Sequence, residues 1–405
     1  MAAVPELNKI HFGDAYAVMS KWPDGFVDCT VTSIPYWLQR LYLPDGHPLR
    51  RFEMGQEASL EKYVSDIGDV FKQVLRVTKD TGVLWLNVGD KVAGPDTRKG
   101  APTYKPGELL DIPGRIAEEL RRRGWLRVGE VIWSKPNTIP DTAPKRPVMA
   151  HERVYLFAKT RDYFFDQYAA QEVSKHQIKG GDETLYTRLR AVWEIPVVSF
   201  NGKKLLADLC EGGRYLEVRE DCPVHGIDPQ VSPGALFDAT CKAVDCTCPE
   251  LTTDFFAAFP PRLVERCILL GTSEKGDHPE TGLPYERVTN KRRISTRPGL
   301  SASEDASKKA RKDPRRHVTI VETVGWKSGE HELIEGVPMR PVVLDPFSGS
   351  GTTAMVAAAL GRDYLGIELN PVYATKLGPR RVEQGWTRSC PHAPRPAAEA
   401  DGAAA

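Results

Sequence analysis

The chain has 405 residues, of which 41% are hydrophobic, so it can bury a sizeable core in one large domain with an inserted module. Its formal net charge is only +1, so a polyanionic partner would have to meet a local basic surface. No apolar run approaches the roughly 20 residues that cross a bilayer, and the first residues lack the apolar core of a signal peptide. These features argue against a membrane partner and predict a cytoplasmic protein.

Strand and helix patterns alternate along the chain. Strand patterns lie at residues 9–14, 26–33, 82–90, 126–136, 152–160 and 363–370, and another begins the segment 341–361. Apolar residues at helical spacing lie at 57–79, 112–124 and 259–273. This alternation predicts an α/β domain with a largely parallel sheet. The regularity fades at about 161–256 and again at 274–340, which predicts a second, inserted module.

A glycine turn carries the first chemical signal. In "VVLDPFSGSGTT" (342–353) a strand ends at Asp345, and the glycines that follow let the backbone approach a ligand where a helix begins. Glu368 ends the next strand, where a carboxylate can accept both hydroxyls of a ribose. The pattern predicts a nucleoside site, and because no phosphate-binding P-loop sequence occurs, the ligand need not be a triphosphate.

A second signal is "TSIPYW" (32–37), in which a core strand ends in a hydroxyl, a proline and two aromatic side chains. Together with "DPFSGSGTT" and "GIELNP" far downstream, it resembles the amino-group DNA methyltransferases that use S-adenosylmethionine, in their permuted, β-type subgroup. Similar segments follow in the order of that family along much of the chain, including "GVLWLNVGD", "VIWSKPN", "HERVYLFAKTRDYFFD" and "AFPPRLVERCILLGTS".

The resemblance implies an α/β fold with a Rossmann-like, mostly parallel sheet of the class I methyltransferase type, circularly permuted and carrying an inserted target-recognition region. With the composition of the inserts and of the last residues, it predicts a catalytic half, an insert for target recognition, a helix that covers the cofactor, a basic insert that contacts DNA, an S-adenosylmethionine-binding half and a disordered tail. Their bounds are 1–160, 161–256, 257–273, 274–340, 341–385 and 386–405.

The same resemblance assigns the catalytic turn. An exocyclic amino nitrogen is a poor nucleophile, because its lone pair is delocalised into the ring, and acceptors for its two hydrogens favour attack. Ser33 and the carbonyl of Ile34 would be these acceptors, Pro35 would shape the turn, and Tyr36 would stack on the flipped-out base. Ile34 stands where the family has a first proline, so an inactive, DNA-binding relative is the alternative interpretation.

The cofactor site implied by the resemblance draws on both halves of the chain. Its residues are Asp14, Asp345, Phe347, Gly349, Ser350, Gly351, Thr352, Glu368, Phe259 and Pro260. Asp14 would lie near the adenine, Glu368 would hold the ribose, and the Phe259–Pro260 segment would cover the methionine part.

The target base is predicted to be cytosine, methylated at N4 in duplex DNA, because a serine at the first position of the turn most often accompanies that specificity in the family. N6-adenine methylation is the alternative. C5-cytosine methylation is disfavoured, since it requires a cysteine nucleophile after proline and no Pro-Cys pair occurs. An enzyme acting on RNA or protein is a further alternative, disfavoured by the large insert and by the serine.

Five of the eight cysteines lie between Cys210 and Cys248. Cys222, His225, Cys246 and Cys248 could bind a structural zinc ion, with Cys210 and Cys241 as further candidates, or the cysteines could be reduced structural residues.

The run from Lys291 to His317 has ten Lys and Arg against three acids, which predicts contact with DNA phosphates. Double-stranded DNA is the expected partner, a cognate restriction endonuclease a further one, and the protein is expected to be a monomer or homodimer.

Overall fold

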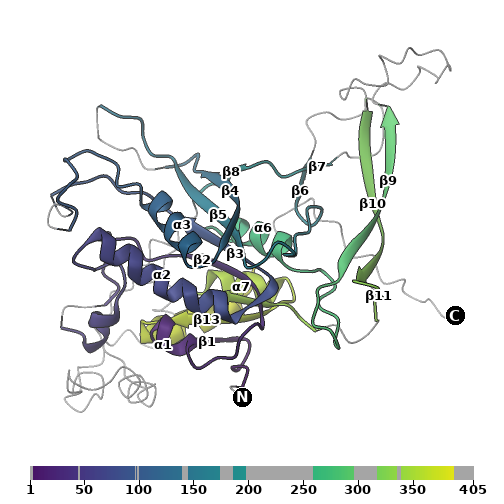
Figure 1. Cartoon of the computed structure of the whole chain (residues 1–405), viewed down its shortest axis with the longest axis horizontal. Coiled ribbons are helices and arrows are strands. Elements are labelled where there is room, and N and C mark those ends of the chain that lie inside the picture. Colours follow the sequence, from purple (N-terminus) through teal and green to yellow (C-terminus); the bar gives the residue numbers. More distant parts are fainter. Residues whose placement is uncertain are drawn as a thin grey trace.

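A computed structural model describes residues 3–43, 46–95, 97, 100–138, 145–173, 186–197, 259–295, 317–334 and 339–386. Its centre is an eight-stranded sheet with the order β1-β13-β12-β2-β3-β5-β4-β8 (Figure 1). In that order the strands are Lys9–Phe12, Asp363–Glu368, Val342–Asp345, Val27–Ser33, Thr78–Val88, His151–Ala158, Leu126–Ser134 and Val192–Glu194.

The sheet is mostly parallel, as the alternating sequence pattern predicted. From β1 through β13, β12 and β2 to β3 every neighbouring pair is parallel. β5 runs antiparallel to both β3 and β4, and β8 is parallel to β4 at the edge. The first strand of the chain thus pairs with β13, so segments more than 350 residues apart form one half of the sheet.

Helices cover both faces of the sheet (Figure 1). Along β3, Leu84 and Leu86 face one hydrophobic core with helices α2 and α3, whereas Val83 and Trp85 face a second core with α6 and α7. This alternation follows from the period of two residues in a strand, and it buries both faces. The helices are α1 Ala15–Met19, α2 Leu60–Val77, α3 Ile112–Arg122, α6 Pro261–Gly271, α7 Thr352–Ala359 and α8 Gly378–Gln384.

Helix α2 shows how the sequence sets such an element. The Ser59 hydroxyl accepts a hydrogen bond from the backbone N–H of Lys62 at 3.1 Å and caps the first turn. Ile67 and Phe71, four residues apart, lie on its buried stripe. Among the described residues, no helix is long and apolar enough to cross a membrane.

A long antiparallel hairpin projects from the main body (Figure 1). It consists of β9 (Glu286–Ser295) and β10 (His317–Ser328), with the short β11 (His331–Glu332) beside β10. A smaller pair is formed by β6 (Gln171–Val173) and β7 (Tyr186–Arg188). These strands lie in the segments where we expected little regular structure, and β8, within residues 161–256, joins the main sheet.

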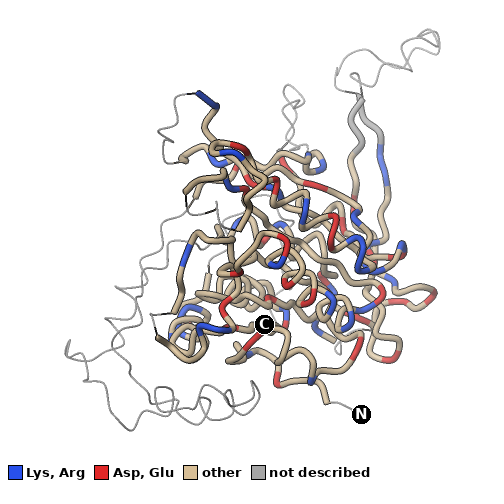
Figure 2. The backbone as a smooth tube through the Cα atoms, turned by 60° about the vertical axis from the view of Figure 1, so that its left-hand side comes forward, with Lys and Arg blue, Asp and Glu red and all other residues tan. Residues whose placement is uncertain are grey.

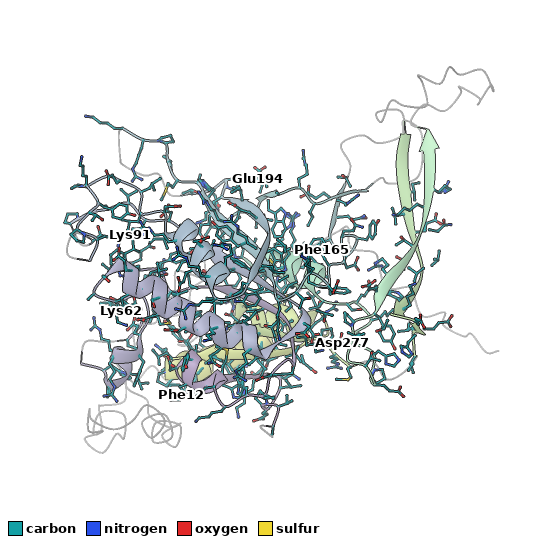
Figure 3. All side chains as sticks on the ribbon, in the orientation of Figure 1. Phe12, Lys62, Lys91, Phe165, Glu194 and Asp277 are labelled. Carbon is teal, nitrogen blue, oxygen red and sulfur yellow. The ribbon has the colours of Figure 1, made fainter. Side chains whose placement is uncertain are left out.

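The base of the hairpin is tied to the main body by ion pairs. Lys79 Nζ lies 2.6 Å from Asp277 and 2.7 Å from Asp28, and all three side chains are largely buried. Figure 3 shows Asp277 where the hairpin joins the body. Over the described elements, Lys and Arg are interspersed with Asp and Glu (Figure 2), in keeping with the near-zero net charge.

Candidate active site

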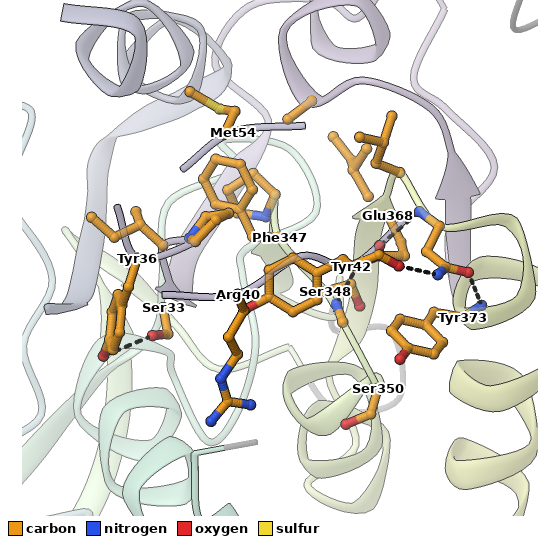
Figure 4. Close-up of a pocket in the computed structure, with 18 of the residues that line it drawn as sticks. Ser33, Tyr36, Arg40, Tyr42, Met54, Phe347, Ser348, Ser350, Glu368 and Tyr373 are labelled. Carbon is orange, nitrogen blue, oxygen red and sulfur yellow. Dashed lines mark hydrogen bonds between the residues drawn. The ribbon is translucent and has the colours of Figure 1, made fainter. Parts of the chain in front are cut away.

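A cavity of about 290 Å³ opens at the carboxyl ends of β2, β12 and β13. Ligands of open α/β sheets bind at such ends. Of the residues predicted from the sequence, those that line the cavity are Asp14, Ser33, Ile34, Pro35, Tyr36, Phe259, Phe347, Gly349, Ser350, Thr352 and Glu368. Asp345, Gly351 and Pro260 are not among its lining residues. The fold therefore brings most of the predicted catalytic and cofactor residues to one cavity (Figure 4).

Ser33 is the last residue of β2 and pairs in register with Asn87 on β3. Asn87 Nδ2 lies 3.3 Å from Ser33 Oγ and donates to it, and the same nitrogen donates to Glu152 Oε2 at 2.6 Å. Because a hydroxyl oxygen has two lone pairs, Ser33 Oγ can still accept a further hydrogen bond.

The side chain and the backbone carbonyl of Ile34 have different environments. The side chain is buried in the core next to α2, with 3% of its surface exposed. Among the described residues, no hydrogen bond to the Ile34 carbonyl oxygen is formed, whereas the next carbonyl, that of Pro35, accepts one from the Tyr63 hydroxyl at 2.8 Å. The apolar side chain thus anchors the turn in the core, and the Ile34 carbonyl keeps its capacity to accept.

The position of the Tyr36 ring is set by hydrogen bonds to its hydroxyl and by close packing against Gly89. The hydroxyl donates to Glu152 Oε2 at 2.7 Å and accepts from Asn87 Nδ2 at 3.1 Å. Burial, reinforced by the charge of Glu152, raises the pKa of Tyr36 well above its ordinary value, so the phenol stays protonated. A Cβ at Gly89 would lie 3.0 Å from the ring, so glycine leaves the space that the ring occupies.

Glu152 and Lys135 form a partly buried ion pair beside this network. Glu152 lies on β5 and Lys135 directly after β4, so the antiparallel pairing of these strands brings together residues 17 apart in sequence. Their segments, "HERVYLFAK" and "VIWSKPN", carried the family resemblance, but we had assigned no role to either residue. Both line the cavity together with Asn87.

The Asp345 carboxylate stabilises the glycine turn through hydrogen bonds. Its carboxylate accepts from the hydroxyls of Thr32 and Thr353, each at 2.7 Å, and from the backbone N–H of Phe347 at 3.1 Å. Burial raises the pKa of Asp345 to about 6, against the effect of these donors. Gly351 has a φ of +77°, and a Cβ there would lie 3.0 Å from Cα of Gly378, so this position of the turn requires glycine.

Glu368 lies at the end of β13 and faces the turn. One carboxylate oxygen accepts from the backbone N–H of Gly349 at 2.7 Å, the other from that of Asn370 at 2.8 Å. Burial raises the pKa of Glu368 to about 7, although both hydrogen bonds oppose this rise. At the adjacent end of β1, the Asp14 carboxylate accepts from Ala17 N–H and caps α1, and burial raises its pKa as well.

Comparison with known proteins places this site in a family. A family model described as DNA methylase matches residues 27–278 and 333–377, almost three quarters of the chain. The chain belongs to this family, which groups N6 and N4 enzymes. The methylase is 26% identical to the type II methyltransferase M.XycI of Xanthomonas campestris pv. cyanopsidis over 385 residues, covering 91% of this chain and 85% of that protein.

Two further matches are similar in kind. The methylase is 31% identical to the type II methyltransferase M.SmaI of Serratia marcescens over 238 residues, which cover 52% of this chain and 78% of that one. Among solved structures, the PvuII DNA methyltransferase (cytosine-N4-specific) aligns with a TM-score of 0.47 and 16% identity, over 94% of this chain and 88% of that one.

The cofactor of this methylase is S-adenosylmethionine, and the residues at the cavity fit that group. An adenosine needs an acceptor for its ribose hydroxyls and a backbone that comes close without side chains, and the cavity offers Glu368 beside Gly349. The aromatic side chains of Phe347 and Tyr373 also line the cavity. The zinc prediction concerns Cys222, His225, Cys246 and Cys248, all of which lie outside the described residues.

Proposed function

We propose that this methylase transfers a methyl group from S-adenosylmethionine to the N4 amino group of a cytosine flipped out of duplex DNA. The observation that carries the proposal is the turn after β2. There the Ser33 hydroxyl and the Ile34 carbonyl lie at one cavity with the glycine turn and Glu368, and no group in the described part of the chain donates a hydrogen bond to that carbonyl. When bound, the cofactor supplies an electrophilic methyl group, and the protein has to make the amino nitrogen nucleophilic.

Ser33 Oγ and the Ile34 carbonyl would each accept one hydrogen of the amino group. Both acceptors favour a pyramidal nitrogen and the positive charge that develops on it, so they bind the transition state more tightly than the planar ground state. Asn87 orients the Ser33 hydroxyl by donating to it. The acceptors are thereby held in place before the base arrives.

Tyr36 would stack on the flipped base, an interaction that contributes about 1–3 kcal/mol per base in single-strand binding. Because the Tyr36 hydroxyl is bound to Glu152 and Asn87, the ring is already oriented. On the cofactor side, Glu368 would accept the ribose hydroxyls, Asp14 would lie near the adenine, and Phe259 would contact the methionine part.

N6-adenine methylation remains the alternative. The N6 amino group of adenine and the N4 amino group of cytosine each present two hydrogens, which Ser33 and the Ile34 carbonyl could accept in the same way. Ser33 supports cytosine, since serine at this position most often accompanies N4 methylation in related enzymes. An inactive relative would need no carbonyl acceptor, so the Ile34 carbonyl, which accepts no hydrogen bond from the residues that the structure describes, supports activity.

The segments at 161–256 and 274–340 would recognise the target sequence on the DNA. In the second segment the β9–β10 hairpin extends away from the body and carries Lys291 and Arg292 on its β9 strand, where they could reach phosphates. The order of the two halves along the chain, with β1 paired to β13, supports a circular permutation of the class I fold. We further propose that the enzyme acts in the cytoplasm, with a cognate restriction endonuclease as its functional partner.

The test supplies purified protein with methyl-labelled S-adenosylmethionine and genomic duplex DNA from a host without DNA methylation. After digestion, the labelled nucleoside is identified by chromatography and mass spectrometry. The proposal predicts N4-methyldeoxycytidine. Label in N6-methyldeoxyadenosine would support the alternative, and absence of label in DNA, with cofactor binding intact, would support the inactive relative.

A further inference from the structure

Arg40 places a positive charge in the cavity and has no hydrogen-bond or ion-pair partner among the described residues. Its side chain lines the cavity and is half-buried, yet within the described part of the chain its guanidinium makes no hydrogen bond or ion pair. Each carboxylate that lines the cavity is already bound by other groups. These acids and their donors are Asp14 with Ala17, Glu53 with Tyr42, Glu152 with Tyr36, Asn87 and Lys135, and Glu368 with Gly349 and Asn370.

The backbone around Arg40 is fixed, so the side chain starts from a defined place. Gln56 Nε2 donates to the Arg40 carbonyl at 2.6 Å. Two residues later, the carbonyl of Tyr42 accepts from Asn370 Nδ2 at 3.1 Å, and this bond links the loop to the turn that follows Glu368. The loop that carries Arg40 is therefore tied to the cofactor side of the cavity.

The Arg40 side chain extends between the turn after β2 and the glycine turn. In Figure 4 its guanidinium reaches into the space between Ser33 on one side and Ser350 on the other. Its charge also acts on the phenol of Tyr42, where it partly opposes the burial that raises the pKa of Tyr42 to about 12. A half-buried cation in this place would be stabilised by an anion that arrives with a ligand.

We propose that Arg40 binds the carboxylate of the methionine part of S-adenosylmethionine. The inference rests on the proposed function, in which the ribose lies at Glu368 and the methyl group points toward Ser33. The amino-acid tail then branches from the sulfur in the space that the guanidinium enters. A planar guanidinium matches a carboxylate with two parallel hydrogen bonds, which a lysine cannot do.

A DNA phosphate is the competing anion for this cation. It is disfavoured because the loop is hydrogen-bonded to the cofactor side through Tyr42 and Asn370. A phosphate also stays on the backbone of the DNA, outside a cavity that admits the flipped base. The two anions are separated by binding experiments in which only one of them is present.

The experiment measures calorimetric affinities of the full-length protein, without DNA, for S-adenosylmethionine and for decarboxylated S-adenosylmethionine, which keeps every other group. Arg40→Gln should weaken binding of the intact cofactor at least about tenfold, as expected for a lost charge-assisted hydrogen bond. Its affinity for the decarboxylated ligand should match that of the parent within about twofold. The affinity of Arg40→Lys for the intact cofactor should fall between those of the parent and of Arg40→Gln. The exposed Arg122→Gln on α3 is the matched control and should change neither affinity.

Equal losses for both ligands, or no loss for either, would overturn the inference. Salt-dependent DNA binding of Arg40→Gln, measured without cofactor, covers the phosphate alternative: a salt slope reduced by about one with unchanged cofactor affinity would assign Arg40 to DNA. The proposed function fails separately. A parent protein that binds the cofactor and discriminates against the decarboxylated form, yet methylates no cytosine, would leave Arg40 in place and refute N4-cytosine transfer.

Discussion

Asn87 and Ser33 lie side by side at the ends of two parallel strands, and the Asn87 amide donates to the Ser33 hydroxyl at 3.3 Å. The same amide reaches Tyr36 and Glu152, so one side chain orients both the acceptor and the stacking ring. Asn87→Ala should lower the single-turnover methylation rate about fivefold or more, the equivalent of roughly 1 kcal/mol for the lost hydrogen bond to Ser33 alone. Cofactor affinity should be unchanged, because Asn87 lies on the target side.

Unchanged rates in rapid-quench assays of Asn87→Ala would show that Ser33 needs no orientation by Asn87. Because Asn87 is only 3% exposed, its substitution can also destabilise the fold. Thermal unfolding of the variant separates a slower reaction from a loss of folded protein.

Gly89 leaves room for the ring of Tyr36. A Cβ at this position would lie 3.0 Å from the ring, and the ring would have to shift by a few tenths of an ångström. Gly89→Ala should therefore slow methylation severalfold, about 1 kcal/mol in the barrier, while leaving cofactor affinity intact. Gly325→Ala is the control, because a Cβ at Gly325 meets nothing within 4 Å. Equal activity of both variants would indicate that the ring position is not critical.

Glu368 should make cofactor binding depend on pH. Burial raises its pKa to about 7 in the empty site, whereas accepting the ribose hydroxyls requires the carboxylate form. Protonation thus competes with binding as the pH falls through 7, and affinity at pH 6 should be about tenfold weaker than at pH 8. Glu368→Ala should weaken binding by about 1–3 kcal/mol.

The control is Glu368→Gln, which cannot titrate. Calorimetry between pH 6 and 8 should find a steep dependence in the parent and a much flatter one in this variant. The same slope in both proteins would assign the titration to another group and remove the argument for Glu368.

Arg381 supports the glycine turn from α8. Its guanidinium donates to the hydroxyls of Ser350 and Thr352, and burial lowers its pKa to about 10. Arg381→Met should leave these hydroxyls without a donor and reduce the free energy of unfolding by about 1–3 kcal/mol. Arg380→Met, on the exposed face of the same helix, should change it by less than about 0.5 kcal/mol. Denaturant unfolding that finds the two variants alike would contradict this role.

Much of the fold was predictable because the apolar residues follow regular periods. The helix predicted at 57–79 is α2, Leu60–Val77, and it begins one residue after the cap at Ser59. The β9–β10 hairpin was missed because "ERVTNKRRIS" is mostly polar and charged and lacks the alternation of a half-buried strand.

The candidate site divides in a similar way. Ser33, Tyr36 and Glu368 were predicted because their motifs are local in sequence. Glu152 and Lys135 were not, because their contact depends on the antiparallel pairing of β4 with β5, which no local pattern specifies. That Asp345 binds the cofactor stays a prediction; in this structure its carboxylate accepts hydrogen bonds from Thr32, Thr353 and the backbone of the turn.

The central claim is that Ser33 and the Ile34 carbonyl activate the amino group of cytosine. The most direct measurement is the single-turnover rate of N4-methylcytosine formation by Ser33→Ala, with Ile34→Pro as the control that keeps the carbonyl. We predict that Ser33→Ala is at least tenfold slower, about 1.4 kcal/mol in the barrier, with DNA and cofactor affinities nearly unchanged, and that Ile34→Pro stays active. A Ser33→Ala protein that forms N4-methylcytosine as fast as the parent would contradict the claim.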